Sequence, residues 1–157
     1  MRPEAKLEDG EVMFRFWPVD LTGESRHEDK MIRAQYHFRP SARGLLSWDV
    51  RRLVNLSKDF TVQLVEVSDI KEVDENHWYA YEGQVPTCRS LVEHMKLIDD
   101  ADFSFPIILD AEGRVMDGMH RVCKAIRQGE FRIAAVQFAV DPEPDYVGRA
   151  PKELPYE

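Results

Sequence analysis

The sequence is poor in cysteine, lacks long apolar runs and has no overall excess of positive charge. Its two cysteines, Cys88 and Cys123, are too few for the disulfide framework of a small secreted domain. No apolar stretch approaches the roughly 20 residues of a membrane helix, and residues 1–30 mix eight acidic with five basic residues, unlike a signal peptide. These absences favour a cytoplasmic protein with no membrane association.

The composition is that of an ordinary soluble globular protein. Hydrophobic residues make up 43% and charged residues 32% of the 157 residues, which suffices for one domain with its own core. The net charge of −8 argues against a nucleic-acid partner, because duplex-binding proteins usually present a broad basic face.

The charge is also unevenly distributed. Residues 31–58 carry six basic residues against one acid, and residues 59–112 carry thirteen acidic against three basic residues. Basic residues then return over residues 114–132. A local basic cluster in an acidic protein suits a small anionic ligand better than a nucleic acid. The arginines of residues 31–58 can equally be solvated charges that pair with the acidic middle of the chain.

The hydrophobic pattern predicts an α+β protein. Residues 1–30 have the character of a separate extension, and Met31 is a candidate for an alternative translation start because regular patterning begins there. Residues 31–59 predict an added strand over 34–38 and a helix that starts after Ser47 as its N-cap. The proline-rich residues 141–157 predict a tail that runs extended over the surface.

Residues 60–140 predict the main domain, with strands over 60–67, 103–109, 114–116 and 131–140. A helix capped by Thr87 or Ser90 begins near Pro86, and another runs over 118–127 and ends at Gly129. The residues that the first of these helices is expected to bury are Leu91, Val92, Met95, Leu97 and Ile98.

The start of the later helix, Asp117-Gly118-Met119-His120-Arg121, has the composition of an anion-binding site. A helix N-terminus offers free N–H groups and a partial positive charge. Gly118 permits close approach of a ligand, and His120 and Arg121 add donors suited to phosphate oxygens. Asp117 is a candidate helix cap, partner of Arg121 or ligand of a phosphate-bound Mg²⁺. Each residue also has an ordinary interpretation, as a cap, a turn glycine or a surface charge.

Residues 105–125 resemble the signature of the ParB/sulfiredoxin superfamily, in which a proline–apolar–apolar strand and a short hairpin precede Asp-Gly-x-His-Arg at a helix start. Residues 62–70 resemble the strand and turn that open that domain, so the resemblance covers residues 60–140. It implies a small mixed sheet with packed helices. It also implies a site for ATP, ADP or CTP, with Gly118, Met119, His120 and Arg121 on the phosphates.

Two branches of the superfamily fit this sequence poorly. Sulfiredoxins resemble it at Gly-x-His-Arg but place their catalytic cysteine at the position of Met119, whose thioether cannot become a thiolate nucleophile. Chromosome-partitioning ParB proteins continue into a helix-turn-helix domain, whereas only the proline-rich tail follows here.

A third branch comprises small free-standing members that resemble amino-acid kinases and use a glutamate in the loop after the first strand. The resemblance makes Glu75, and with less support Glu72, the candidate acceptor of a substrate hydroxyl's proton, with Asp117 as a second catalytic residue. These acids can equally belong to a solvated loop. Arg89, near the start of a helix, is a further candidate for phosphate contact or for pairing with neighbouring carboxylates.

Two functional hypotheses follow. The first is a nucleotide-dependent phosphotransferase or nucleotide hydrolase that acts on a small molecule. The second is a non-catalytic module that senses a nucleotide or binds a protein, motivated by residues 1–30 and by Trp17, Trp48 and Trp78, since such additions often form interfaces. A DNA-binding ParB-like protein is the third choice.

Overall fold

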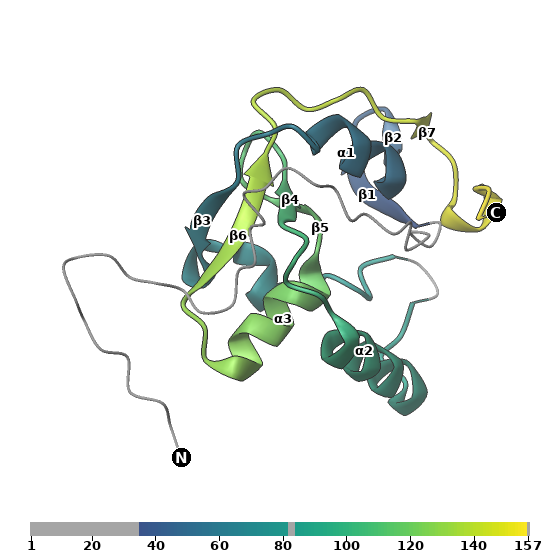
Figure 1. Ribbon diagram of the computed structural model, residues 1–157. Coiled ribbons are helices and arrows are strands. Elements are labelled where there is room, and N and C mark those ends of the chain that lie inside the picture. Colours follow the sequence, from purple (N-terminus) through teal and green to yellow (C-terminus); the bar gives the residue numbers. More distant parts are fainter. Residues whose placement is uncertain (1–34, 82–83, 157) are drawn as a thin grey trace, which may run out of the picture.

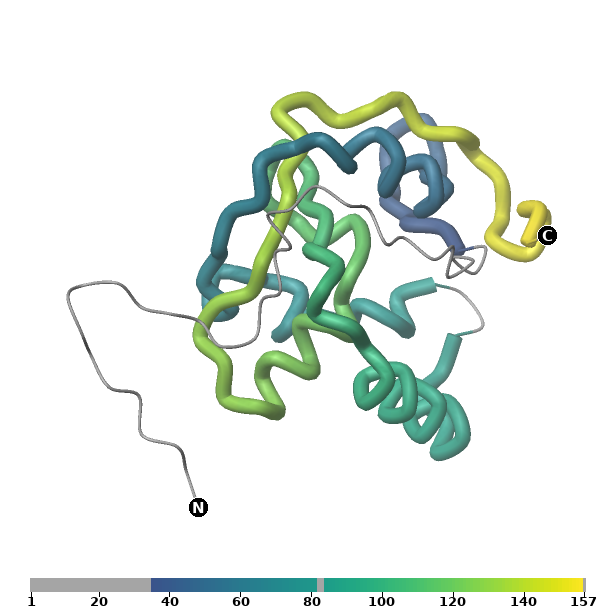
Figure 2. Tube along the Cα trace, viewed as in Figure 1, coloured from purple at the N-terminus to yellow at the C-terminus, as the bar shows by residue number. Residues whose placement is uncertain are grey.

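The computed structural model describes residues 35–81 and 84–156, which form an α+β protein with two small sheets (Figures 1 and 2). Residues 1–30, Met31 and Trp17 lie outside the described residues. The strands are β1 (Tyr36–Ser41), β2 (Gly44–Asp49), β3 (Gln63–Glu66), β4 (Ile107–Leu109), β5 (Val115–Asp117), β6 (Arg132–Gln137) and β7 (Tyr146–Val147). The helices are α1 (Val50–Ser57), α2 (Cys88–Asp100) and α3 (Met119–Gln128), with 3-10 turns η1 (Val67–Asp69), η2 (Lys71–Asp74) and η3 (Pro151–Glu153).

The larger sheet is mixed and has the strand order β3-β6-β4-β5. Strands β4 and β5 form an antiparallel hairpin, and α3 then returns the chain so that β6 lies parallel to β4. Strand β3 pairs antiparallel to β6. The smaller antiparallel sheet has the order β1-β2-β7.

Strands β4 and β6 of the larger sheet are buried on both faces. Ile107 and Leu109 pack with α3 on one face, where Val122 is fully buried. The intervening Ile108 packs on the opposite face with Trp48 and Leu53 of the β2–α1 unit. A strand covered on both sides has apolar residues in succession rather than in alternation, which explains the continuous apolar run of β4.

The start of α1 differs from the prediction. Ser47 is not an N-cap: it lies within β2, and Asp49 caps the helix by accepting a 2.9 Å hydrogen bond from the Arg51 N–H group. Leu46 and Trp48 have strand spacing and both pack against the larger sheet, so their burial extends the strand past Ser47.

The predicted buried stripe of α2 is wrong for four of its five residues. Thr87 caps the helix as predicted, through a 3.2 Å bond from the Ser90 N–H group. Of the stripe, only Ile98 is buried. Four side chains, those of Leu91, Val92, Met95 and Leu97, are between 44% and 64% exposed.

The strands predicted over 60–67, 103–109 and 131–140 are longer than β3, β4 and β6, the strand predicted over 34–38 lies at 36–41, and β2 was not predicted. The tail has more structure than predicted. The strand expected over 103–109 is confined to β4, because residues 103–105 lie in a turn region before Pro106. Within the tail, β7 pairs with β2, and the Trp48 indole N–H donates a 2.8 Å bond to the Pro142 carbonyl. Within the described residues, no helix is long and apolar enough to cross a membrane.

Candidate functional site

A cleft of about 1310 Å³ lies where the start of α3 meets β1, the segment after η2 and the C-terminal segment. Its volume exceeds the roughly 300–1,000 Å³ of a typical small-molecule site. The predicted site residues that line it are Glu75, Asp117, Gly118, Met119 and His120. Arg121 adjoins it through its ion pair with Asp117. Arg89 is exposed on the first turn of α2 and is not part of the cleft wall.

Gly118 is the N-cap of α3 and has a left-handed backbone conformation, with φ of +109°. A Cβ atom at this position would lie 2.6 Å from Cγ2 of Ile107 and 2.8 Å from Nη2 of Arg121. The packing of the chain itself therefore requires glycine here. Since glycine has no capping side chain, the first N–H groups of α3 are left for water or a ligand.

Asp117 and Arg121 form an ion pair of 2.6 Å, and their side chains are only 17% and 16% exposed. Among the predicted roles of Asp117, that of ion-pair partner of Arg121 is observed, whereas Gly118 occupies the helix-cap position. The catalytic role of Asp117 stays a prediction. The Nε atom of Arg121 is buried without a hydrogen-bond partner. The pair fixes the guanidinium beside the start of α3.

His120 is held by residues that sequence analysis did not connect with it. Its Nε2 atom is 2.9 Å from Nδ1 of His94 on α2. The Trp78 indole stacks on both imidazoles, with ring centroids 4.1 Å from His94 and 4.9 Å from His120. Burial lowers the pKa of His120 to about 4 and also lowers the pKa of His94. His120 is therefore neutral at pH 7 and can give a phosphate a hydrogen bond but no positive charge.

Glu75 and Glu72 both contact Arg114, but their surroundings differ. Glu75 is exposed and accepts two hydrogen bonds from the Arg114 guanidinium, which lower the pKa of its carboxyl group. Glu72 is 4% exposed, accepts a 3.0 Å hydrogen bond from the Val115 N–H group and forms an ion pair with Arg114 Nε at 3.2 Å. A carboxylate with a lowered pKa is a weaker general base. The catalytic role of Glu75 stays a prediction.

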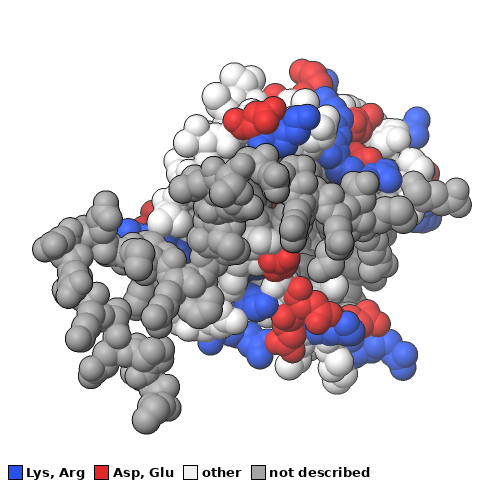
Figure 3. Space-filling model, viewed as in Figure 1, with Lys and Arg blue, Asp and Glu red and all other residues white. Residues whose placement is uncertain are grey.

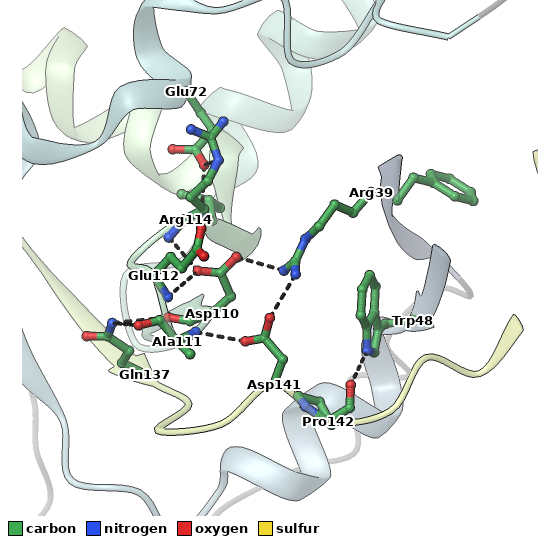
Figure 4. A network of polar contacts seen from close by, with 12 residues as sticks. Arg39, Trp48, Glu72, Asp110, Ala111, Glu112, Arg114, Gln137, Asp141 and Pro142 are labelled. Atoms are coloured by element: carbon green, nitrogen blue, oxygen red, sulfur yellow. Dashed lines mark hydrogen bonds and ion pairs between the residues drawn. The ribbon is translucent and has the colours of Figure 1, made fainter. Parts of the chain in front are cut away.

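A second polar network joins β1 to the β4–β5 hairpin (Figure 4). Arg39 lies 2.7 Å from both Asp110 and Asp141, and its guanidinium carbon is 4.9 Å from the ring centroid of Trp48. Asp110 is 2% exposed and accepts N–H bonds within the hairpin from Glu112 and Arg114. The network fixes the added strand β1 against the predicted main domain, on one wall of the cleft.

Four of the five histidines of the chain gather around this cleft. His37, His77 and His120 line it, and His94 lies behind His120. Burial lowers the pKa of His37 to about 3 and also lowers the pKa of His77. These histidines are far apart in sequence, so only the tertiary structure reveals the cluster.

The cleft has more acidic than basic residues. Its basic residues are Arg39, Arg114 and Lys152, whereas its acidic residues are Glu72, Glu75, Asp110, Glu112 and Asp117. Both arginines are in ion pairs, whereas Lys152 forms none with another described residue. Basic and acidic side chains also intermingle over the described part of the surface in Figure 3.

The described residues contain no group of three His, Cys, Asp or Glu side chains placed to hold a metal ion. A phosphate-bound Mg²⁺ at this cleft would therefore take phosphate and water oxygens as most of its ligands, as Mg²⁺ commonly does. The pair with Arg121 uses the Oδ2 atom of Asp117, so a metal ligand from this residue would come from its Oδ1 atom.

Comparison with known proteins gives no match to a family model, a curated protein or a solved structure. The likeness to the ParB/sulfiredoxin superfamily thus stays a prediction from residues 62–70 and 105–125, while the general α+β class is the one observed.

Proposed function

We propose that this protein binds a nucleotide, with the phosphates at the start of α3 and the remainder in the cleft. The observation that carries the proposal is the N-terminus of α3, which has no capping side chain and borders the cleft at Gly118. Arg121 is fixed beside it by Asp117. Free N–H groups and the helix dipole attract phosphate at such a position.

The acidic residues of the cleft do not oppose this proposal as strongly as their number suggests. Arg39 neutralises charge on Asp110, Arg114 on Glu75, and Arg121 on Asp117. Lys152 supplies a positive charge without an ion pair among the described residues. A Mg²⁺ ion carried by the nucleotide would offset the remaining negative charge.

A specific observation favours binding without rapid turnover over phosphoryl transfer. Both candidate catalytic carboxylates are held in ion pairs, Glu75 with Arg114 and Asp117 with Arg121. The hydrogen bonds from Arg114 also lower the pKa of Glu75, which makes it a weaker general base. A nucleotide-sensing module is therefore the better-supported form of the proposal. Phosphotransferase or hydrolase activity stays the alternative.

Thermal unfolding in the presence of ATP, ADP and CTP, with and without Mg²⁺, tests the proposal. Ligand at 100 times its Kd stabilises the folded state by about 2.7 kcal/mol, so at least one nucleotide should raise the Tm of the wild type. Arg121→Ala should abolish that increase. Arg127→Ala is the matched control, because Arg127 lies on the same helix but pairs with Asp99, away from the cleft.

If no nucleotide raises the Tm of the wild type, the proposal fails. If Arg121→Ala and Arg127→Ala respond to nucleotide as the wild type does, the phosphates do not bind at α3. Release of ADP or phosphate from bound ATP, measured with candidate hydroxyl substrates, separates turnover from simple binding.

A further inference from the structure

Besides Trp78, four aromatic side chains from three separate segments line the same cleft as the start of α3. They are Tyr36 and Phe38 of β1, Tyr81 after η2, and Tyr156 in the C-terminal segment. We call this group the aromatic wall. Three of its members lie outside residues 60–140, so it is built mainly from the parts added to the predicted main domain.

The rings of the aromatic wall contact one another in sequence. The Phe38 ring centroid lies 5.5 Å from Tyr81 and 6.3 Å from Tyr36, and Tyr36 lies 5.3 Å from Tyr156 in an edge-to-face arrangement. These separations are typical of aromatic pairs that stabilise each other. The wall is therefore one continuous apolar surface.

The hydroxyl groups of the wall are engaged by backbone carbonyls. Tyr81 donates to the Phe38 carbonyl at 3.0 Å, Tyr156 to the Pro151 carbonyl at 2.9 Å, and Tyr36 to the Pro155 carbonyl at 2.5 Å. These bonds fix the oxygen ends of the side chains and leave the ring surfaces as the groups available to a ligand. A surface fixed in this way requires little reordering when it binds.

The rings remain accessible despite their mutual contacts. Tyr156 is 49% exposed, and Tyr36, Phe38 and Tyr81 are partly exposed. Burial raises the pKa values of Tyr36, Tyr81 and Tyr156, so their hydroxyl groups are uncharged at neutral pH. The chemical group that such a wall accommodates best is a flat, uncharged ring that covers aromatic surface.

We infer that the aromatic wall is the subsite for the heterocyclic base of the ligand. The inference rests on the proposed nucleotide site and adds that affinity depends on the base as well as on the phosphates. Lys152 lines the same cleft, so a charged and a stacking surface are available to one ligand. A tripolyphosphate ion would use only the charged surface, whereas a nucleoside triphosphate would use both.

Isothermal titration of ATP, CTP and inorganic tripolyphosphate, each with Mg²⁺, tests the inference. Base stacking on aromatic side chains contributes about 1–3 kcal/mol per base, so a nucleoside triphosphate should bind at least about fivefold more tightly than tripolyphosphate. Tyr156→Leu and Tyr81→Leu should each weaken nucleotide binding by about fivefold and leave tripolyphosphate binding unchanged. Tyr156→Phe and Tyr81→Phe keep the aromatic rings, so they should lose less nucleotide affinity than the leucine variants.

Tyr146→Leu is the matched control. The Tyr146 ring lies 6.0 Å from Tyr36 but is not part of the cleft wall, so its loss disturbs the same ring cluster without removing cleft surface. It should leave binding of both ligands unchanged. Circular dichroism and Tm values of each variant verify folding, and Tyr156 is an exposed position that the core does not need.

The outcomes separate the two proposals. Equal affinity of the wild type for nucleotide and tripolyphosphate, or retained nucleotide affinity in both leucine variants, overturns the base subsite and leaves the phosphate site standing. If Tyr146→Leu lowers nucleotide affinity as much as Tyr156→Leu and Tyr81→Leu do, the base subsite is also overturned. If neither nucleotide nor tripolyphosphate binds, the proposed function itself fails.

Discussion

Helices α2 and α3 lie side by side (Figure 1) and both have amphipathic sequences, but they are attached to the protein in different ways. Helix α3 buries Met119, Val122 and Ala125 against the larger sheet. Helix α2 buries only Ile98. An amphipathic sequence therefore predicts that a helix has an apolar face, whereas the tertiary structure determines whether that face is covered.

The contacts between the two helices are largely polar. His94 bonds to His120, Lys124 donates to the Asp99 and Ala101 carbonyls at 3.0 and 2.6 Å, and Arg127 pairs with Asp99 at 2.5 Å. Such contacts are sensitive to pH and salt in a way that the packing of α3 is not. The two helices should thus respond differently to matched substitutions.

The largest difference should come from one substitution made on each helix. Val122→Asp places a carboxylate at a fully buried position of α3 and should destabilise the protein by about 4 kcal/mol or more. Val92→Asp makes the same change at a 64% exposed position of α2 and should cost less than about 1 kcal/mol. Urea unfolding gives both values. A similar cost at both positions would show that the α2 face is covered.

The glycines at the two ends of α3 provide the next comparison. Gly118→Ala combines a φ of +109° with contacts below 3.0 Å and should cost about 2–3 kcal/mol. Gly129→Ala has a φ of +74°, but no atom lies within 4 Å of the added Cβ, so it should cost only about 1 kcal/mol. Thermal unfolding of both variants measures the difference. Equal costs would mean that Ile107 and Arg121 move aside without penalty.

The histidine contact between the helices should weaken in acid. The pKa of His120 falls from its ordinary 6.5 to about 4 on folding, so the unfolded chain binds the proton more tightly. The stability from neutral His120 is therefore complete above pH 6.5 and is lost as the pH falls towards 4. The expected loss is about 1 kcal/mol after allowance for solvent screening.

Urea unfolding of the wild type and of His120→Gln should be measured at several pH values. The difference between the two proteins isolates the contribution of His120 protonation to stability from that of the carboxylates. The wild type should lose more stability than His120→Gln between pH 6.5 and 4. Parallel pH profiles would contradict the assignment of a neutral His120.

The smallest effect should come from the Arg127–Asp99 ion pair. Both side chains are more than half exposed, and exposed ion pairs contribute about 0–1 kcal/mol. Asp99→Asn should change the unfolding free energy by less than about 0.5 kcal/mol at physiological salt. If Asp99→Asn loses more unfolding free energy than this, and the loss shrinks as salt is added, the attachment of α2 depends on this ion pair.

The features that could be predicted from the sequence are those that depend on residues near one another in the chain. The β4–β5 hairpin, the Thr87 cap and the end of α3 at Gly129 depend on neighbouring residues, and the structure confirms each of them. The Asp117–Arg121 pair is also local, since its members are one helical turn apart. Local chemistry is visible in a single sequence.

The features that sequence analysis missed depend on distant residues. Arg39 is 71 residues from Asp110 and 102 from Asp141, and His94 is 26 residues from His120. Ser47 has the chemistry of an N-cap but lies in a strand because Trp48 packs on the larger sheet. No local pattern specifies these contacts, because they arise only when separate segments pack together.

The placement of Trp78 over two imidazoles makes the cleft optically observable. An indole in contact with a protonated imidazole loses fluorescence, and Trp78 is stacked on both His94 and His120. Trp48 is 1% exposed and packs in the core, so its emission should change mainly on unfolding. In a Trp17→Phe background, the two remaining indoles would thus report separately on protonation of the histidines beside the α3 N-terminus as the pH falls and on integrity of the fold.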